Sequence, residues 1–164
     1  MADSDARQAA TRILAATDVK QIAVLEVFQL LVVLARGNLQ VYAISAIPSS
    51  PPTFQMLQTI QIDCNTFIEG RSMGKHLICC LKTSMSSSTV KVLEVEASRV
   101  KATDSQSCIE PPATSAIDLK LWKEFYIPYK SSEMSLTESG LCIASKNGLD
   151  LVALDTLELK PFRY

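Results

Sequence analysis

The hydrophobic pattern of the chain repeats one unit three times: a short apolar run, a polar turn and a second strand-like run. The three units are Leu30–Ile44, Leu77–Val95 and Leu141–Leu154. Alternation of apolar and polar residues with a period of two is typical of a half-buried strand, and the Gly-Asn, Asn-Gly and serine-rich turns allow the chain to reverse. Each unit therefore predicts a β-hairpin. Because an isolated hairpin is only marginally stable in water, we expect several sheets to bury their faces together.

The same pattern predicts further strands and one linker. Leu30–Leu34 is apolar throughout, as expected of a strand covered on both faces. Pro48–Pro52 cannot sustain a ladder, because proline donates no hydrogen bond. No long segment has the helical period of 3.6. The remaining expected strands are Val19–Leu25, Leu39–Ile44, Gln58–Asp63, Phe67-Ile68 (stopped by Glu69-Gly70), His76–Leu81, Thr89–Val95, Leu119–Ile127, Met134–Leu136, Leu141–Ala144 and Leu149–Leu154.

The spacing of the repeated units suggests propeller blades. Leu30, Leu77 and Leu141 begin the units and are 47 and 64 residues apart. A four-stranded blade spans about 40–50 residues, and the second interval is longer by about the size of a polar surface loop expected at 96–117. The predicted fold class is all-β, a partial β-propeller-like array of about three to four antiparallel sheets.

The predicted domain covers residues 11–160 and follows a frayed start at residues 1–10. The first residues leave two alternatives open. Ser4 or Asp5 could cap a short helix, or Thr11–Ala15 could form a strand that leads into the first repeat, which we favour slightly.

Composition and charge exclude several classes. Hydrophobic residues make up 48% and charged residues 20%, and the net charge of −1 gives no general attraction to nucleic acid or acidic membranes. The most apolar stretch, Ile22–Ala35, is shorter than the roughly 20 residues of a membrane helix, and the N-terminus does not resemble a secretory signal. We therefore expect no transmembrane segment and a reduced, cytoplasmic chain. Its five scattered cysteines would be mostly small buried groups, and they are Cys64, Cys79, Cys80, Cys108 and Cys142.

Nucleophilic catalysis by a serine or cysteine with a histidine base would have to use His76, the single histidine. No glycine-flanked serine elbow accompanies it, so a structural or surface role is expected. Zinc needs about four ligands at close spacing, whereas Cys79 and Cys80 are adjacent and the other cysteines are distant. We predict no catalytic, cofactor-binding or metal-binding residues, and no bound cofactor.

Gly70–Lys75 superficially resembles a phosphate-binding loop. The Gly-x4-Gly-Lys-Ser/Thr order is missing, because His76 follows the lysine. We predict a basic turn between strands, and Arg71 and Lys75 could face an acidic partner as an alternative to being merely solvated.

Aromatic residues and serines offer two further candidate surfaces. Trp122 and Tyr126 are expected on one face of a strand and Phe125 on the other, with core packing favoured over a binding patch. The serine cluster could be a phosphorylated turn or an inert one, and its members are Ser84, Ser86, Ser87 and Ser88. The partner-binding residues stay unassigned.

Three segments carry a family resemblance. DVKQIAVLEVFQLLVVLARGNLQVYAISAI (Asp18–Ile47) is similar to the opening blades of a citron homology (CNH) domain, and LICCLKTSMSSSTVKVLEV (Leu77–Val95) to its strand–serine turn–strand element. Lys123–Glu158 resembles the family's most recognisable stretch: Phe-Tyr-Ile-Pro, a Leu-Cys-Ile strand and an Asp-x-x-Thr-Leu-Glu turn. The segments occur in the family's order, in the form found at the C-terminal end of fungal-type Rho guanine nucleotide exchange factors.

The resemblance implies a non-catalytic regulatory module that binds proteins, including a small GTPase as a candidate partner, in Rho-type signalling. Alternatives are a vesicle-tethering or kinase-associated interaction module and, from another class, a small hydrolase that uses His76. The family's module is nearly twice as long, so the chain is expected to be truncated at both ends. An incomplete ring would expose strand edges, which invite self-association.

Overall fold

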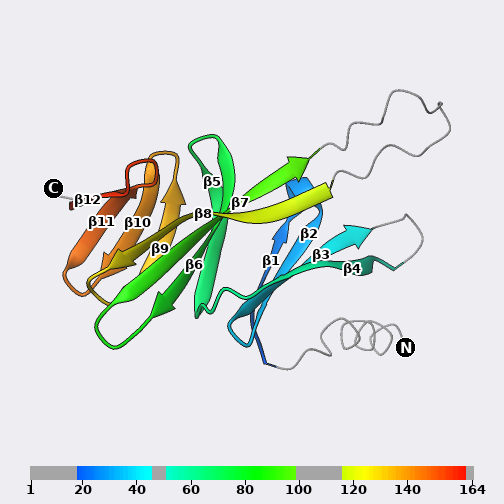
Figure 1. Ribbon diagram of the computed structural model, residues 1–164, viewed down its shortest axis with the longest axis horizontal. Coiled ribbons are helices and arrows are strands. Elements are labelled where there is room, and N and C mark those ends of the chain that lie inside the picture. Colours follow the sequence, from blue (N-terminus) through cyan, green and yellow to red (C-terminus); the bar gives the residue numbers. More distant parts are fainter. Residues whose placement is uncertain (1–17, 46–50, 99–115, 162–164) are drawn as a thin grey trace. The chain divides into compact units, whose positions relative to one another are not determined.

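The structure, a computed structural model, describes residues 18–45, 51–98 and 116–161. The strands in these ranges form three four-stranded antiparallel sheets (Figure 1), which confirms the all-β class and the expected number of sheets. The first sheet contains β1–β4, the second sheet β5–β8 and the third sheet β9–β12. The strands are β1 Val19–Leu25, β2 Leu30–Ala35, β3 Asn38–Ser45, β4 Thr53–Ile60, β5 Thr66–Ser72, β6 Lys75–Thr83, β7 Ser88–Ser98, β8 Ala116–Ile127, β9 Glu133–Thr137, β10 Gly140–Ser145, β11 Gly148–Ala153 and β12 Glu158–Pro161.

Strands that are consecutive in sequence are neighbours in every sheet, so each sheet is a simple antiparallel meander. This is the connectivity of a propeller blade, in which short turns join four strands. By contact density the chain divides into two compact units, Met1–Phe67 and Ile68–Tyr164.

The first sheet is built around β2, whose six residues are all buried. Its apolar run therefore behaves as the sequence predicts for a strand covered on both faces. Arg36 and Gly37 turn the chain into β3 with φ of 53° and 78°. Glycine adopts positive φ without strain, whereas this conformation is uncommon for a residue such as Arg36. The Cys64 backbone N–H donates to the Gly37 carbonyl oxygen at 3.0 Å, which attaches the segment after β4 to this turn.

Gln21, on β1, fixes the start of β5 within the first unit. Its Oε1 accepts hydrogen bonds from the Phe67 backbone N–H at 3.0 Å and from Thr66 Oγ1 at 2.9 Å, and its Nε2 donates to the Phe67 carbonyl oxygen at 2.5 Å. One carboxamide thus pairs with both backbone groups of Phe67, as a neighbouring strand would.

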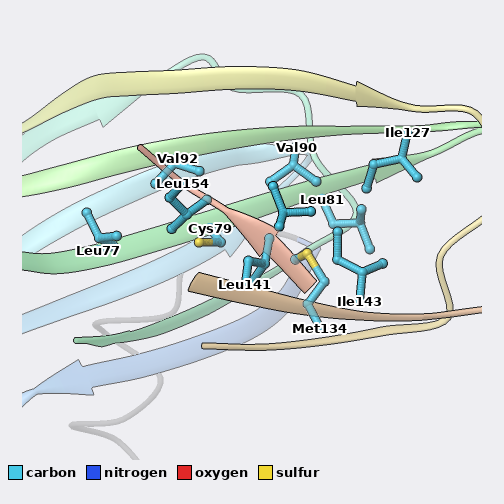
Figure 2. Close-up of a cluster of buried hydrophobic side chains, with 11 residues drawn as sticks. Leu77, Cys79, Leu81, Val90, Val92, Ile127, Met134, Leu141, Ile143 and Leu154 are labelled. Carbon is cyan, nitrogen blue, oxygen red and sulfur yellow. The ribbon is translucent and has the colours of Figure 1, made fainter. Parts of the chain in front are cut away.

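The second and third sheets share one hydrophobic core, which lies between them in the second unit. Figure 2 shows the side chains of the two sheets turned toward one another. Leu77, Cys79 and Leu141 are completely inaccessible to solvent. Burial of apolar surface on this scale is the main source of stability for a pair of packed sheets. The buried members are Leu77, Cys79, Leu81, Val90, Val92, Ile127, Met134, Leu141, Ile143, Val152 and Leu154.

A bulge in β8 changes the expected positions of the aromatic residues. Trp122 and Phe125 both pack against the shared core, whereas Tyr126 is exposed. The register of β8 shifts opposite Val92 and Leu93 of β7, which leaves Trp122 as the extra residue. Because a bulge interrupts strict alternation, the prediction that Trp122 and Tyr126 share a face was wrong. The expected core role of Trp122 and Phe125 is confirmed.

Several element bounds also differ from the predictions. The fourth strand runs over β4, earlier than the expected Gln58–Asp63, and β5 continues through Gly70 to Ser72. Backbone pairing sustains these strands where side-chain alternation is weak. β12 was not predicted; it pairs with β11 at the third sheet's edge.

Some expectations fall partly or wholly outside the described residues. Both ends of the polar loop expected at 96–117 belong to strands, because β7 reaches Ser98 and β8 begins at Ala116. Residues 99–115, the start of the chain with its helix-or-strand alternative, and most of the proline-rich linker lie outside the described residues.

Candidate functional site

A surface pocket of about 400 Å³ lies at one end of the second unit. Three connections form it: the turn between β6 and β7, the connection from β8 to β9, and the turn between β10 and β11. In Figure 1 these connections gather at the lower left, where the second and third sheets end together. We call this site the turn-end pocket. Its lining residues are Met85, Ser86, Pro128, Tyr129, Lys130, Ser131, Ser132, Ser145, Lys146 and Asn147.

The connection from β8 to β9 is fixed to β7 through one buried serine. Ser88 Oγ donates to the Tyr129 carbonyl oxygen at 3.0 Å and accepts from the Ser131 backbone N–H at 2.9 Å. Ser88 and Ser131 are 1% and 3% exposed, so both bonds are shielded from water. Buried polar groups with satisfied hydrogen bonds hold a segment in a single conformation.

The same connection is attached on its other side to β10. The Ser132 backbone N–H donates to the Ala144 carbonyl oxygen at 2.9 Å, and the hydroxyls of Ser131 and Ser132 donate to this oxygen at 3.3 Å and 3.1 Å. The Ala144 carbonyl oxygen on β10 thus accepts hydrogen bonds from two consecutive serines. The pocket wall is therefore held by hydrogen bonds to both sheets.

Tyr129 is anchored by its side chain as well as its backbone. Its hydroxyl donates a hydrogen bond to Asp150 Oδ2 on β11. Burial, together with the hydrogen bond and negative charge of Asp150, raises the pKa of Tyr129 above its usual range. The phenol is therefore a stable donor at neutral pH, and it satisfies an acceptor of Asp150 beside the pocket.

Both charged side chains that line the pocket are cationic, and the Asp150 carboxylate beside the pocket is bonded to Tyr129. Lys130 and Lys146 line it, both are exposed, and no aspartate or glutamate is among the lining residues. Within the part of the chain that the structure describes, neither lysine has an ion-pair partner. Met85 adds an apolar side chain that is 98% exposed. The pocket therefore offers two cationic groups beside an apolar surface.

The surroundings of His76 and Cys79 do not match those of a catalytic base and its nucleophile. His76 Nε2 lies 2.8 Å from Glu69 Oε2, and the two residues come from adjacent strands β6 and β5. Cys79 lies in the shared core, where burial raises its pKa to about 12. Its thiol is protonated at neutral pH, and a protonated buried thiol is a poor nucleophile. No cluster of three or more metal-ligating side chains occurs among residues 18–45, 51–98 and 116–161.

The predicted basic turn is smaller than Gly70–Lys75. Only Met73 and Gly74 form it, because β5 ends at Ser72 and β6 begins at Lys75. Lys75 Nζ lies 3.2 Å from Glu94 Oε2 and 4.6 Å from the centre of the Trp122 ring. Lys75 therefore has partners within its own sheet.

Sequence reasoning did not single out the two lysines of the pocket. Lys130 follows the Phe-Tyr-Ile-Pro motif, and Lys146 precedes the Asn147-Gly148 turn; both motifs were recognised separately. The serine turn between β6 and β7 was also recognised, as a modification site or an inert turn. Nothing in the sequence spacing indicates that the three connections meet, because their contact depends on the packing of the two sheets.

The fold and site define a class: an all-β domain of blade-like sheets with a pocket at the turns that join its strands. The sequence model of the CNH domain matches residues 2–163, and the chain belongs to this family. No helix among the described residues is both long and apolar enough to cross a membrane.

The chain is similar to two known proteins, one of which is a Rho1 exchange factor. Over 142 residues, 86% of the chain, it is 28% identical to Rho1 guanine nucleotide exchange factor 1 of Schizosaccharomyces pombe (strain 972 / ATCC 24843). The match covers 11% of that curated relative, so the chain spans about a tenth of its length. A solved structure described as the AfRom2 CNH domain is 33% identical, with a TM-score of 0.60, over 89% of this chain and 41% of that one.

Proposed function

We propose that the chain is a non-catalytic protein-interaction module that acts in the cytoplasm in Rho-type small GTPase signalling. Residues 11–160 are its proposed domain. Its relationship to a Rho1 exchange factor supports the signalling context. The main observation that supports an interaction role is the turn-end pocket, which is open and is held by hydrogen bonds to two sheets. Binding sites are concentrated in loops positioned by a rigid scaffold.

The burial of Cys79, a cysteine three residues after His76, supports a non-catalytic role. Cys79 is completely buried and its pKa is raised, and the His76 ring is paired with a carboxylate from the neighbouring strand. Nucleophilic catalysis requires an accessible, activated thiol or hydroxyl within reach of a base. The proposed action is therefore recognition of a protein partner.

A retention experiment tests this proposal. The full chain is immobilised and exposed to purified Rho-type GTPase loaded with GDP or with a non-hydrolysable GTP analogue. A small GTPase of another family is the specificity control. We expect retention of the Rho-type protein in at least one nucleotide state and not of the control.

A hydrolase screen on the same preparation provides the opposing outcome. Substrate turnover that His76→Ala abolishes, without retention of any GTPase, would overturn the interaction role. Circular dichroism of the His76→Ala variant ensures that lost turnover is not lost folding.

A further inference from the structure

We infer that the turn-end pocket binds an acidic peptide segment of a partner protein, with Lys130 and Lys146 as the groups that recognise its carboxylates. This inference rests on the proposed role in protein interaction and names the chemistry of the partner. It assigns binding residues to a site that the sequence left unassigned.

Charge complementarity is the first argument. The chain as a whole carries a net charge of −1, yet this pocket is lined by two lysines and by no acidic residue. The described part of the chain provides neither lysine with an ion pair. Lys75 differs, because Glu94 already neutralises it. Lys130 and Lys146 therefore remain available for carboxylates from another molecule, which would form charge-assisted hydrogen bonds with their ammonium groups.

Preorganisation is the second argument. The two lysines belong to different connections, and hydrogen bonds from Ser131 and Ser132 to Ala144 join the β8–β9 connection to the strand that precedes Lys146. Ser88 fixes the same connection to β7. A site whose backbone is already ordered loses less conformational entropy when a flexible ligand binds.

The apolar lining favours a peptide over a free inorganic anion. Met85 and Pro128 line the pocket together with the lysines, and Met85 is almost entirely exposed. A phosphate ion would use the lysines and leave this apolar surface in contact with water. A peptide segment with an apolar residue beside its acidic residues would cover both, and exposed methionine adapts to varied apolar side chains.

Fluorescence anisotropy with the full chain tests the inference. The probe is a fluorescein-labelled eight-residue peptide of alternating glutamate and leucine, and its matched control replaces each glutamate with glutamine. We expect saturable binding of the glutamate peptide and at least about tenfold weaker binding of the glutamine peptide, because the ammonium–carboxylate contacts are lost. Raising the salt concentration should weaken binding of the glutamate peptide, since salt screens exposed charges.

Variants locate the binding to the pocket. Lys130→Gln/Lys146→Gln should weaken binding of the glutamate peptide at least about fivefold, because both cationic groups are removed. Lys20→Gln/Lys123→Gln is the control, since it changes the net charge equally at residues outside the pocket. Equal loss in both double variants would show attraction by net charge alone and would overturn the site. Circular dichroism should show that both variants fold.

Two further measurements separate this inference from the proposed function. If the Rho-type GTPase is retained but the glutamate peptide does not bind, the inference fails and the proposed function stands. If the peptide binds through the two lysines and no GTPase is retained, the GTPase-linked function fails and the inference stands. Sedimentation with phosphatidylserine vesicles, lost in Lys130→Gln/Lys146→Gln without any peptide binding, would assign the pocket to a membrane surface and overturn the peptide.

Discussion

At the scale of single residues, two buried serines differ in whether their hydroxyls have hydrogen-bond partners. Ser88 bonds to Tyr129 and Ser131 beside the turn-end pocket. Ser72 is equally buried, and its Oγ has no partner among the described residues. An unpaired buried hydroxyl costs free energy, whereas a paired one satisfies its neighbours. The two positions therefore offer a matched test of the hydrogen bonds that hold the pocket.

Ser88→Ala should lower the free energy of unfolding by about 1–3 kcal/mol, because it leaves the buried Ser131 N–H without an acceptor. Ser72→Ala, the same chemical change, should be neutral or slightly stabilising. Urea unfolding of the two variants measures both effects. Equal destabilisation by the two substitutions would contradict the assigned hydrogen bonds.

The buried thiol of Cys79 should make stability depend on alkaline pH. Burial raises its pKa from 9.0 to about 12, so the folded state keeps its proton where the unfolded chain loses it. The stability that the buried Cys79 thiol contributes is fully present below pH 9. It is lost as the pH rises toward 12, with a slope approaching about 1.4 kcal/mol per pH unit.

Urea unfolding at a series of pH values between 9 and 11 checks this slope against the Cys79→Val variant. Valine is apolar and of similar size, so the variant keeps the other titrating groups and lacks only the thiol. Its stability should decrease less steeply. Parallel slopes would show that Cys79 is not the group responsible.

At the scale of elements, the start of β10 depends on a glycine. A Cβ on Gly140 would lie 2.2 Å from the Val152 carbonyl oxygen on the neighbouring strand β11. Gly148, which begins β11, also has positive φ, at 135° against 147° for Gly140, but a Cβ there meets nothing within 4 Å. Alanine substitutions at these two glycines therefore separate the cost of backbone strain from the cost of a steric collision.

Gly140→Ala should lower the free energy of unfolding by about 3 kcal/mol, because β10 and β11 must move apart to accommodate the methyl group. Gly148→Ala should cost about 1 kcal/mol, from conformation alone. Thermal and urea unfolding give both values. A Gly140→Ala effect no larger than that of Gly148→Ala would show that the strands do not approach as described.

At the scale of the whole molecule, the shared core predicts that the second and third sheets unfold together as one cooperative unit. Leu141 on β10 is completely buried in a cluster that also contains Leu77 and Val92 of the second sheet. Leu141→Ala should cost about 2–5 kcal/mol by creating a cavity.

Hydrogen exchange should show the loss of protection after Leu141→Ala in β6 and β7 as well as in the third sheet, because both sheets lose a common packing surface. Leu121→Ala is the control, since Leu121 is 55% exposed and should change little. Protection lost only in the third sheet would contradict a shared core.

The sequence predicted the hairpins well because their information is local. The reversals expected at Gly37-Asn38 and Asn147-Gly148 lie within one residue of the observed turns. Gly37 and Gly148 have the positive φ that glycine tolerates, and the apolar run of β2 predicted its burial. The sequence pattern wrongly put Trp122 and Tyr126 on one face and did not predict β12, because a bulge and an edge strand depend on pairing with neighbours.

What the sequence by itself determined is the class of element, the order of the hairpins and the family resemblance, since alternation and turn chemistry act over a few residues. Only the tertiary structure decided that Lys130 and Lys146, on separate connections, line one pocket. The physical reason is that packing of the shared core and the hydrogen bonds of Ser88, Ser131 and Ser132 bring these turns together. Contacts between residues distant in the chain leave no periodic signal in it.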